Sequence, residues 1–196
     1  VNTIRFHNDQ IIGHSTDGPG FAEAVTSELG ISLTNKRFLV LGAGGAARAI
    51  VQQLLQLDCQ LLIANRTMLR AKELLQEIET SQRSQIELVE LQADALAKVV
   101  DQCDIIVNTT TVGMQDTITQ SPMPIELLLP SHSVIDIIYN PQETRLLREA
   151  RARGCQTRNG VGMLVWQAVK AWEFWWGITP NVDVMYAAVE NALNSK

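Results

Sequence analysis

One stretch, residues 37–70, limits the possible folds of this chain more than any other. It opens with an apolar run at 38–41, whose length and glycine-rich flank are typical of a buried parallel strand. Gly42, Gly44 and Ala47 follow in the spacing of the G-x-G-x-x-A dinucleotide fingerprint. There the first glycine permits a tight turn, the second lets a pyrophosphate approach the backbone, and the alanine lets the next helix pack closely.

A helix and a second strand are predicted directly after the glycines. The helix carries its apolar residues on one face, and its N-terminus offers free N–H groups and a positive dipole end to a phosphate. A second apolar run, 60–64, ends at Asn65. Strand, glycines, amphipathic helix and strand in this order favour a nucleotide site far more strongly than an isolated motif.

The rest of the chain alternates between apolar runs and amphipathic segments. This alternation predicts an α/β fold with a Rossmann-like doubly wound parallel sheet and a ligand crevice at the carboxyl ends of its strands. A polar loop is expected at 81–85. Further strands are predicted at 86–91, 105–107, 134–138 and 155–157, and helices at 67–79, 94–100 and 144–153.

Both ends of the chain differ from this alternation. The first residues predict a hairpin of two strands that turns at 7–10, followed by a helix that starts at Thr16 or Asp17 and stops at Gly30. After residue 162 comes a helix that holds all four tryptophans. A last amphipathic helix follows Pro180, with an inward face at Val184, Ala188 and Leu193 or nearby residues.

Composition excludes several classes of protein. A net charge of −5 with no basic run argues against nucleic-acid binding, and no apolar stretch is long enough to cross a membrane. The start has no signal-peptide pattern. Cys59, Cys103 and Cys155 lie far apart in apolar segments, which predicts reduced, buried thiols in a cytoplasmic protein. No metal site is expected, because cysteines and histidines share no ligand spacing.

The residue types after the second strand bear on the cofactor. Proteins that bind NAD usually place an acidic residue there, which accepts from the ribose 2′-hydroxyl. This chain has Asn65, followed by Arg66 and, one helical turn on, Arg70. A carboxylate would repel a 2′-phosphate, whereas two guanidinium groups bind one, so NADP is the predicted cofactor. The alternative is that both arginines are ordinary solvated side chains.

Other polar residues have two interpretations on sequence grounds. Asp17 fits a helix cap as well as a catalyst. Asn108 and the threonines after it fit a turn, yet they follow a strand where a nicotinamide should lie. Tyr139 has the same ambiguity. The tryptophans are interpreted as packing residues, because so much apolar area on one helix needs a cover.

Seven groups of residues together resemble the shikimate dehydrogenase family and cover nearly the whole chain. They are Val1 to Ile4; Ser15 to Gly18 with Gly20; the glycine loop LGAGGAARA; Asn65-Arg66-Thr67 with Arg70-Ala71; Asn108-Thr109-Thr110 with Gly113-Met114; Asp136 to Pro141; and Gly160 to Leu164 with Gln167.

The resemblance implies an NADP-dependent dehydrogenase that interconverts 3-dehydroshikimate and shikimate, on the route to chorismate and the aromatic amino acids. It assigns Asp17 to a catalytic lysine–aspartate pair, and it assigns substrate binding to Asn2, Asp17, Tyr139 and Gln167. It assigns cofactor binding to the glycine loop (Gly42, Ala43, Gly44, Gly45, Ala46, Ala47), the adenosine phosphate site (Asn65, Arg66, Thr67, Arg70) and the nicotinamide side (Asn108, Thr109, Ile137, Gly160).

Two departures from the family matter. Family members normally begin some tens of residues before the Val1 segment, and that region carries the substrate-binding serines and the catalytic lysine. Residues 1–17 are then the tail of a substrate domain, 18–33 a connecting helix, 34–160 the NADP-binding domain and 161–196 helices that pack toward the substrate domain. The second departure is Ser15, where the family usually has asparagine, a small polar change that we expect to be tolerated.

We therefore expect a chain that binds NADP(H) but turns over little or no substrate. Apolar surface, above all on the tryptophan-rich helix, is expected to be exposed or to drive a homodimer or artificial association. Three alternatives stay open: a quinate/shikimate dehydrogenase that uses NAD, a stand-alone non-catalytic NADP-binding module, and a bifunctional enzyme of the same pathway without its dehydratase domain.

Overall fold

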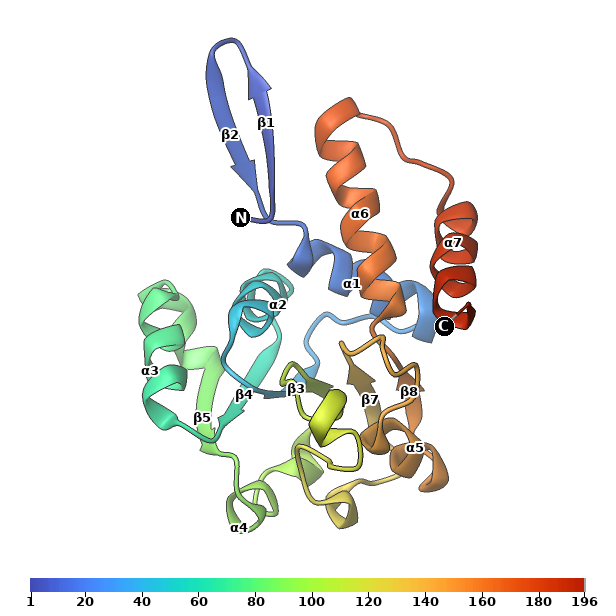
Figure 1. The fold of residues 1–196 in the computed structure, drawn as a ribbon. Coiled ribbons are helices and arrows are strands. Elements are labelled where there is room, and N and C mark those ends of the chain that lie inside the picture. The colour runs from blue at the N-terminus through green and yellow to red at the C-terminus, as the bar shows by residue number, and fades with distance from the viewer. Residues whose placement is uncertain (196) are drawn as a thin grey trace.

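A parallel sheet of six strands forms the centre of the structure, a computed structural model that describes residues 1–195 (Figure 1). Its strands lie in the order β5-β4-β3-β6-β7-β8. The predicted α/β fold with a doubly wound sheet is confirmed. The strands are β3 Arg37–Leu41, β4 Gln60–Asn65, β5 Ile86–Glu90, β6 Ile105–Asn108, β7 Ser133–Asp136 and β8 Gln156–Arg158.

The strand order determines where a ligand crevice is expected. From β3 the chain builds outwards to β4 and β5, then returns to lay β6 on the other side of β3 and continues to β7 and β8. In doubly wound sheets, ligands bind at the carboxyl ends of the strands where this reversal occurs. The register aligns these ends: Leu41 pairs with Ala64 on one side and with Asn108 on the other, and Asn108 pairs with Asp136.

Helices cover both faces of the sheet because successive strand residues point to opposite sides. Phe38 and Val40 join one buried cluster with α1, α2 and α3, while Leu39 and Leu41 join another with α4 and α5. The helices are α1 Asp17–Leu29, α2 Gly45–Leu55, α3 Met68–Glu77, α4 Ala93–Leu96, α5 Arg145–Ala152, α6 Val161–Trp176 and α7 Val182–Asn194; short 3₁₀ turns are η1 Thr80–Gln85, η2 Val100–Gln102, η3 Gln115–Thr117 and η4 Ile125–Leu127.

The predicted hairpin stands apart from the sheet. Strands β1 Thr3–His7 and β2 Gln10–His14 pair antiparallel through a two-residue turn whose Asn8 and Asp9 both have positive φ. The hairpin projects beyond the rest of the fold beside the end of α6 (Figure 1). Arg5 donates to the carbonyl of Phe174 at 2.8 Å, and the Trp175 indole donates to the carbonyl of Ile4 at 3.0 Å. These contacts hold its base against the helix.

Several predicted bounds were wrong for identifiable reasons. Strand β7 stops at Asp136 rather than 138, because the Asp136 carboxylate accepts from the Ile138 N–H at 3.1 Å and draws the chain out of the sheet. The predicted loop at 81–85 is the 3₁₀ turn η1, and Arg83 closes it by donating to the carbonyls of Gln76 and Ile78.

The inward face of the last helix agrees with the prediction only in part. Leu193 is half-buried as predicted, but Val184 and Ala188 are exposed, and Tyr186 and Val189 are half-buried in their place. Tyr186 donates from its hydroxyl to a Glu28 carboxylate oxygen at 2.7 Å, which fixes how α7 is rotated. A polar contact therefore overrides the apolar pattern here.

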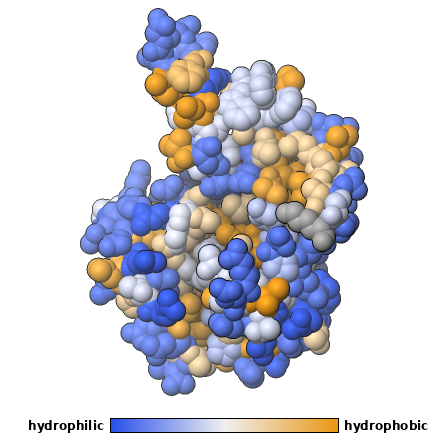
Figure 2. Space-filling view, in the orientation of Figure 1, coloured by the Kyte–Doolittle hydropathy of each residue, from blue (hydrophilic) through white to orange (hydrophobic). Residues whose placement is uncertain are grey.

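Apolar surface is exposed on two elements rather than mainly on one. The tryptophan-rich helix α6 exposes Trp172, Trp175 and Trp176, as expected, but Phe6 and Ile11 on the hairpin are more exposed, at 73% and 69%. Figure 2 shows apolar residues on the projecting hairpin below its hydrophilic tip. Within residues 1–195, none of the helices combines the length and apolarity required to cross a bilayer.

Candidate cofactor and substrate site

The glycine loop lies where β3 ends and α2 begins. Gly42 has φ +111°, a conformation that L side chains rarely adopt, and a Cβ there would lie 2.6 Å from the Thr109 hydroxyl oxygen. The next two glycines are different: Gly44 and Gly45 are exposed, and no atom lies within 4 Å of a Cβ built on either. The backbone is therefore open to a ligand at the N-terminus of α2, where free N–H groups favour an anion.

The alanines of the loop pack beneath that open backbone. Ala47 is fully buried and Ala43 nearly so, within the cluster that joins α2 to the sheet. Ala46 is half-buried at the start of the helix. The small third residue of the motif thus does what the fingerprint requires: it lets α2 lie close to β3.

The loop after β4 exposes unpaired positive charge. Asn65 donates from its side-chain amide to the carbonyl of Thr67 at 2.8 Å and so shapes the turn. Thr67 stands at the N-cap of α3, but its side chain makes no capping hydrogen bond. Arg66 and Arg70 are exposed, and neither forms an ion pair with any residue of 1–195. Asn65 and the two arginines together suit a phosphate, and position 65 lacks the carboxylate that usually accepts from a ribose 2′-hydroxyl.

The loop after β6 has its polar groups turned inwards. Asn108 is fully buried: its amide donates to the Asp136 carboxylate at 3.0 Å and to the Val112 carbonyl at 3.2 Å. Its oxygen accepts from the N–H and hydroxyl of Thr110. The hydroxyl of half-buried Thr109 donates to the carbonyl of Leu41 at 2.7 Å, which ties this loop to the glycine loop. The Asn108 amide is thus fully used inside the protein.

Asp136 ends β7 as a fully buried carboxylate. It accepts from Asn108, from the Ile138 N–H and, at 2.7 Å, from the Thr144 hydroxyl. Burial raises the pKa of this carboxyl above its ordinary range, and the three hydrogen bonds oppose that rise only in part. Asp136 belongs to one of the motifs that carry the family resemblance, but the sequence alone predicts no role for it. A carboxylate at the end of an apolar strand was the available signal.

The N-terminus of α6 closes this side of the crevice. Gly160 donates from its N–H to the Ile138 carbonyl at 2.9 Å, and a Cβ on Gly160 would overlap the carbonyl group of Ile137. Ile137 itself is half-buried. The structure therefore brings together these two residues, both predicted for the nicotinamide end.

On the predicted substrate side, Asn2, Thr16 and Asp17 form one hydrogen-bonded group. The Asn2 amide donates to the Thr16 hydroxyl at 2.9 Å and to the Asp17 carboxylate at 2.8 Å, while the Asn2 oxygen accepts from the Thr16 N–H at 2.9 Å. Asn2 thus holds the Asp17 carboxylate directly. Thr16 is fully buried, and the sequence alone predicts only a helix-capping role for it.

Gln167 and Tyr139, the other two predicted substrate residues, lie on α6 and in the loop after β7. A Cβ on Gly20, one turn after Thr16, would lie 2.6 Å from the Gln167 backbone nitrogen, so α1 and α6 cross closely here. Tyr139 is 42% exposed in the loop after β7. Within the described chain, no hydrogen bond joins Tyr139 to Asn2, Asp17 or Gln167.

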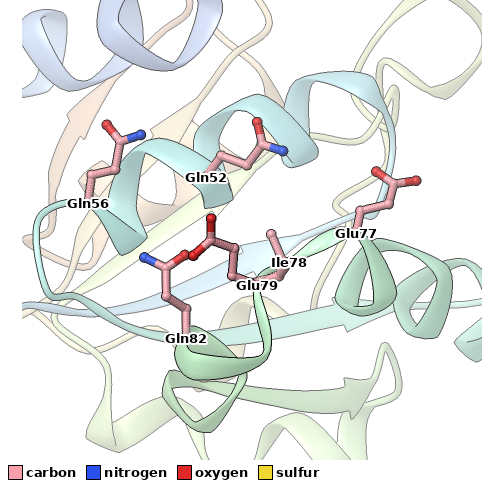
Figure 3. A pocket seen from close by; sticks show the side chains of 6 residues that line it. All are labelled: Gln52, Gln56, Glu77, Ile78, Glu79 and Gln82. Atoms are coloured by element: carbon pink, nitrogen blue, oxygen red, sulfur yellow. The ribbon is translucent and has the colours of Figure 1, made fainter.

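A separate groove of about 390 Å³ lies between α2 and η1 and does not belong to this site (Figure 3). It borders the C-terminal half of α2, away from the glycine loop. Carboxylates and amides dominate its walls, and carboxylates disfavour a phosphate. The lining residues are Gln52, Gln56, Glu77, Ile78, Glu79 and Gln82. Among the described residues, no cluster of three potential metal ligands occurs.

Two family models match this chain. The family described as shikimate/quinate 5-dehydrogenase matches residues 23–138, and the C-terminal domain of shikimate 5′-dehydrogenase matches residues 160–190. The chain belongs to the shikimate/quinate 5-dehydrogenase family. The predicted resemblance is confirmed, and so is the prediction of an oxidoreductase family.

Individual relatives agree with the family. A shikimate dehydrogenase (NADP(+)) of Geobacillus kaustophilus is 42% identical over 194 residues, which cover 98% of this chain and 68% of the relative. The shikimate dehydrogenase of Thermus thermophilus, solved with NADP(H) and shikimate, matches with a TM-score of 0.84 and 35% identity over 98% of this chain and 68% of that one. A quinate dehydrogenase of Corynebacterium glutamicum, solved with NAD, matches with a TM-score of 0.87 and 30% identity, over 97% of this chain and 67% of that one. The chain spans about two-thirds of the length of such relatives.

Proposed function

We propose that this chain binds NADP(H), and that the protein to which it belongs reversibly reduces 3-dehydroshikimate to shikimate. One observation carries the cofactor assignment: Arg66 and Arg70, which form no ion pair within residues 1–195, follow the strand next to the open glycine loop, with Asn65 in place of an acidic residue. The NADP-linked relatives support the same choice. From the family resemblance we also propose the division into 1–17, 18–33, 34–160 and 161–196.

In this proposal each loop of the crevice holds one part of the cofactor. The pyrophosphate lies on the backbone of the glycine loop, where Gly44 and Gly45 leave room. The 2′-phosphate lies between Arg66 and Arg70, with the Thr67 hydroxyl as a further donor. The nicotinamide lies toward Thr109, Ile137 and Gly160. When bound, the cofactor supplies or accepts the hydride.

The substrate side is proposed to lie around Asp17. Asn2 fixes the Asp17 carboxylate, Asp17 accepts a hydrogen bond or proton from a substrate hydroxyl, and Gln167 and Tyr139 supply further contacts. Within residues 1–195, no lysine forms an ion pair with Asp17. Reduction of a carbonyl needs a proton donor at its oxygen, so we expect this chain alone to bind cofactor with little turnover.

A binding comparison tests this function. The purified chain is titrated with NADPH, NADH and adenosine 2′,5′-bisphosphate, which carries the 2′-phosphate but has no nicotinamide. We expect NADPH to bind roughly 100-fold tighter than NADH, equivalent to about 2.7 kcal/mol. Equal affinities would contradict the NADP assignment. Reduction of 3-dehydroshikimate at the rate of an intact dehydrogenase would contradict the proposed low turnover.

The quinate relative motivates a second candidate, an NAD-linked quinate/shikimate dehydrogenase. This alternative predicts that NADH binds at least as tightly as NADPH, so the same titration separates the two. The two unpaired arginines favour the first candidate.

Location and assembly stay predictions of this proposal. The three cysteines are buried free thiols, and burial raises the pKa of Cys59 and Cys103 to about 11. Such thiols are inert and fit a reducing cytoplasm. The exposed apolar residues of α6 and the hairpin fit association with a second protein surface, including another copy of this chain.

A further inference from the structure

The buried carboxylate of Asp136 joins three separate segments at the carboxyl edge of the sheet. Asn108 reaches it from the end of β6, and Thr144 reaches it from the N-cap of α5. Ile138 donates to it from the loop after β7. The Thr144 hydroxyl oxygen also accepts from the Leu147 N–H, so the same side chain caps α5. One carboxylate therefore sets the relative positions of both loops and of the helix that follows them.

This network lies under the part of the crevice assigned to nicotinamide. Strands β6 and β7 neighbour each other, and β6 neighbours β3. In dinucleotide-binding sheets the first half receives one mononucleotide and the second half receives the other. Because the glycine loop and Arg66 belong to the first half, the loops tied by Asp136 border the second mononucleotide.

Asp136 is not placed to contact the cofactor itself. Its side chain has no exposed surface, and neither has that of Asn108. Its influence passes instead through the backbone. The Ile138 N–H donates to Asp136 while the Ile138 carbonyl accepts from the Gly160 N–H, so a continuous path leads from the carboxylate to the start of α6.

The cost of this arrangement argues for a role beyond packing. No basic side chain within residues 1–195 pairs with Asp136, although the carboxylate is fully buried. An unpaired buried carboxylate is expensive, and apolar residues of similar size usually stabilise a core as well or better. The carboxylate instead holds three segments in fixed relative positions, because a donor from each of them binds to one of its two oxygens.

We propose that Asp136, acting through Asn108, Ile138 and Thr144, is a positioning residue that fixes the nicotinamide end of the cofactor site. The proposal rests on the proposed binding of NADP(H). It assigns Asn108, expected from the sequence to touch the cofactor, an indirect role in holding the loop.

Two probes distinguish this role from a general loss of structure. NADPH occupies both halves of the crevice, whereas adenosine 2′,5′-bisphosphate occupies only the first. We expect Asp136→Asn to weaken NADPH binding roughly tenfold and to leave binding of the bisphosphate within about twofold. Thr144→Val removes one donor to the carboxylate and has the same selective effect, and Thr144→Ser restores the hydroxyl and the affinity.

Asp104→Asn is the matched control. Asp104 accepts from the Arg37 N–H at 2.9 Å at the opposite, amino edge of the sheet, so the same change there leaves the affinity for both probes unaltered. Should Asp136→Asn fail to unfold cooperatively, the Thr144→Val and Thr144→Ser pair decides the question. Equal losses for both probes, or no loss for either, would overturn the proposal. A wild-type chain that binds neither probe would instead refute the proposed function.

Discussion

The carboxyl ends of β3 and β4 present their polar groups to solvent, whereas the carboxyl ends of β6 and β7 bury theirs. On the first side, Gly44 and Gly45 have open backbone, and Arg66 and Arg70 have no ion pair within residues 1–195. On the second side, Asn108, Asp136 and Thr144 are all nearly or fully buried, and they satisfy one another.

The difference indicates two ways of building a site. Exposed, unpaired donors bind a ligand directly, so a substitution there should change affinity for one chemical group of the ligand. A buried, mutually satisfied network has nothing left to offer a ligand, so a substitution there should act through the shape of the loops. Gly42 and Thr109 join the two sides, since the Thr109 hydroxyl lies against Gly42 and donates to Leu41.

Gly42→Ala should disturb the loops on both sides and have the largest effect on stability and on NADPH binding. The added methyl group meets the Thr109 hydroxyl oxygen at 2.6 Å, and the residue must keep φ near +111°. Strain of this kind costs about 2–4 kcal/mol of unfolding free energy. Urea denaturation measures that loss, and we expect NADPH binding to fall below detection. Gly45→Ala is the control: its Cβ meets nothing, so stability should rise by about 0.5 kcal/mol.

The double variant Arg66→Gln/Arg70→Gln should affect the first side alone. Each lost charge-assisted contact to the 2′-phosphate is worth about 1–2 kcal/mol, so affinity for NADPH should fall roughly 100-fold while affinity for NADH stays constant. Isothermal titration measures both. Arg148→Gln/Arg153→Gln, which removes two exposed arginines at α5, should change neither affinity. A parallel loss of NADH binding would show that the arginines shape the loop rather than recognise phosphate.

The two sides were not equally predictable from the sequence. The first side follows from short-range rules: an apolar run, glycines at fixed spacing and the residue types at 65–70 all lie within one stretch. The structure keeps that stretch as predicted, and β4 ends only one residue later. Local spacing was sufficient because the strand, loop and helix are consecutive in the chain.

The second side depends on contacts between residues distant in sequence. Asn108 and Asp136 are separated by a whole crossover, and only their register in neighbouring strands brings them together. Periodicity extended β7 to residue 138 because Ile137 and Ile138 are apolar, yet the Asp136 side chain ends the strand. The contact of Asn2 with Thr16 and Asp17 likewise requires the hairpin to fold back. The pattern of apolar and polar residues cannot predict either of these long-range contacts.

Thr16→Val tests a region that should be independent of both sides. It removes the buried hydroxyl that accepts from the Asn2 amide and keeps the shape of the side chain. We expect a loss of about 1–2 kcal/mol in unfolding free energy, because the Asn2 amide loses a partner, with NADPH affinity within about twofold of wild type. Thr16→Ser, which keeps the hydroxyl, should recover most of the stability. A fall in NADPH affinity would mean that the substrate side and the cofactor side are coupled.

The smallest expected effect is a pH dependence that belongs to the second side. Burial raises the pKa of Asp136 above the ordinary value of 3.8, so the folded state holds this proton to higher pH than the unfolded state does. Because the folded state binds more protons in that window, the contribution of Asp136 to stability falls as pH rises from about 4 through its folded pKa and is constant above it. Asp136→Asn lacks this titration. The Tm of the wild type, measured relative to the Tm of Asp136→Asn, should therefore fall as pH rises through this window. A difference for Asp136→Asn that is flat with pH would show that the three donors hold the pKa of the carboxyl near its ordinary value, and that the second side tolerates its buried charge at little cost.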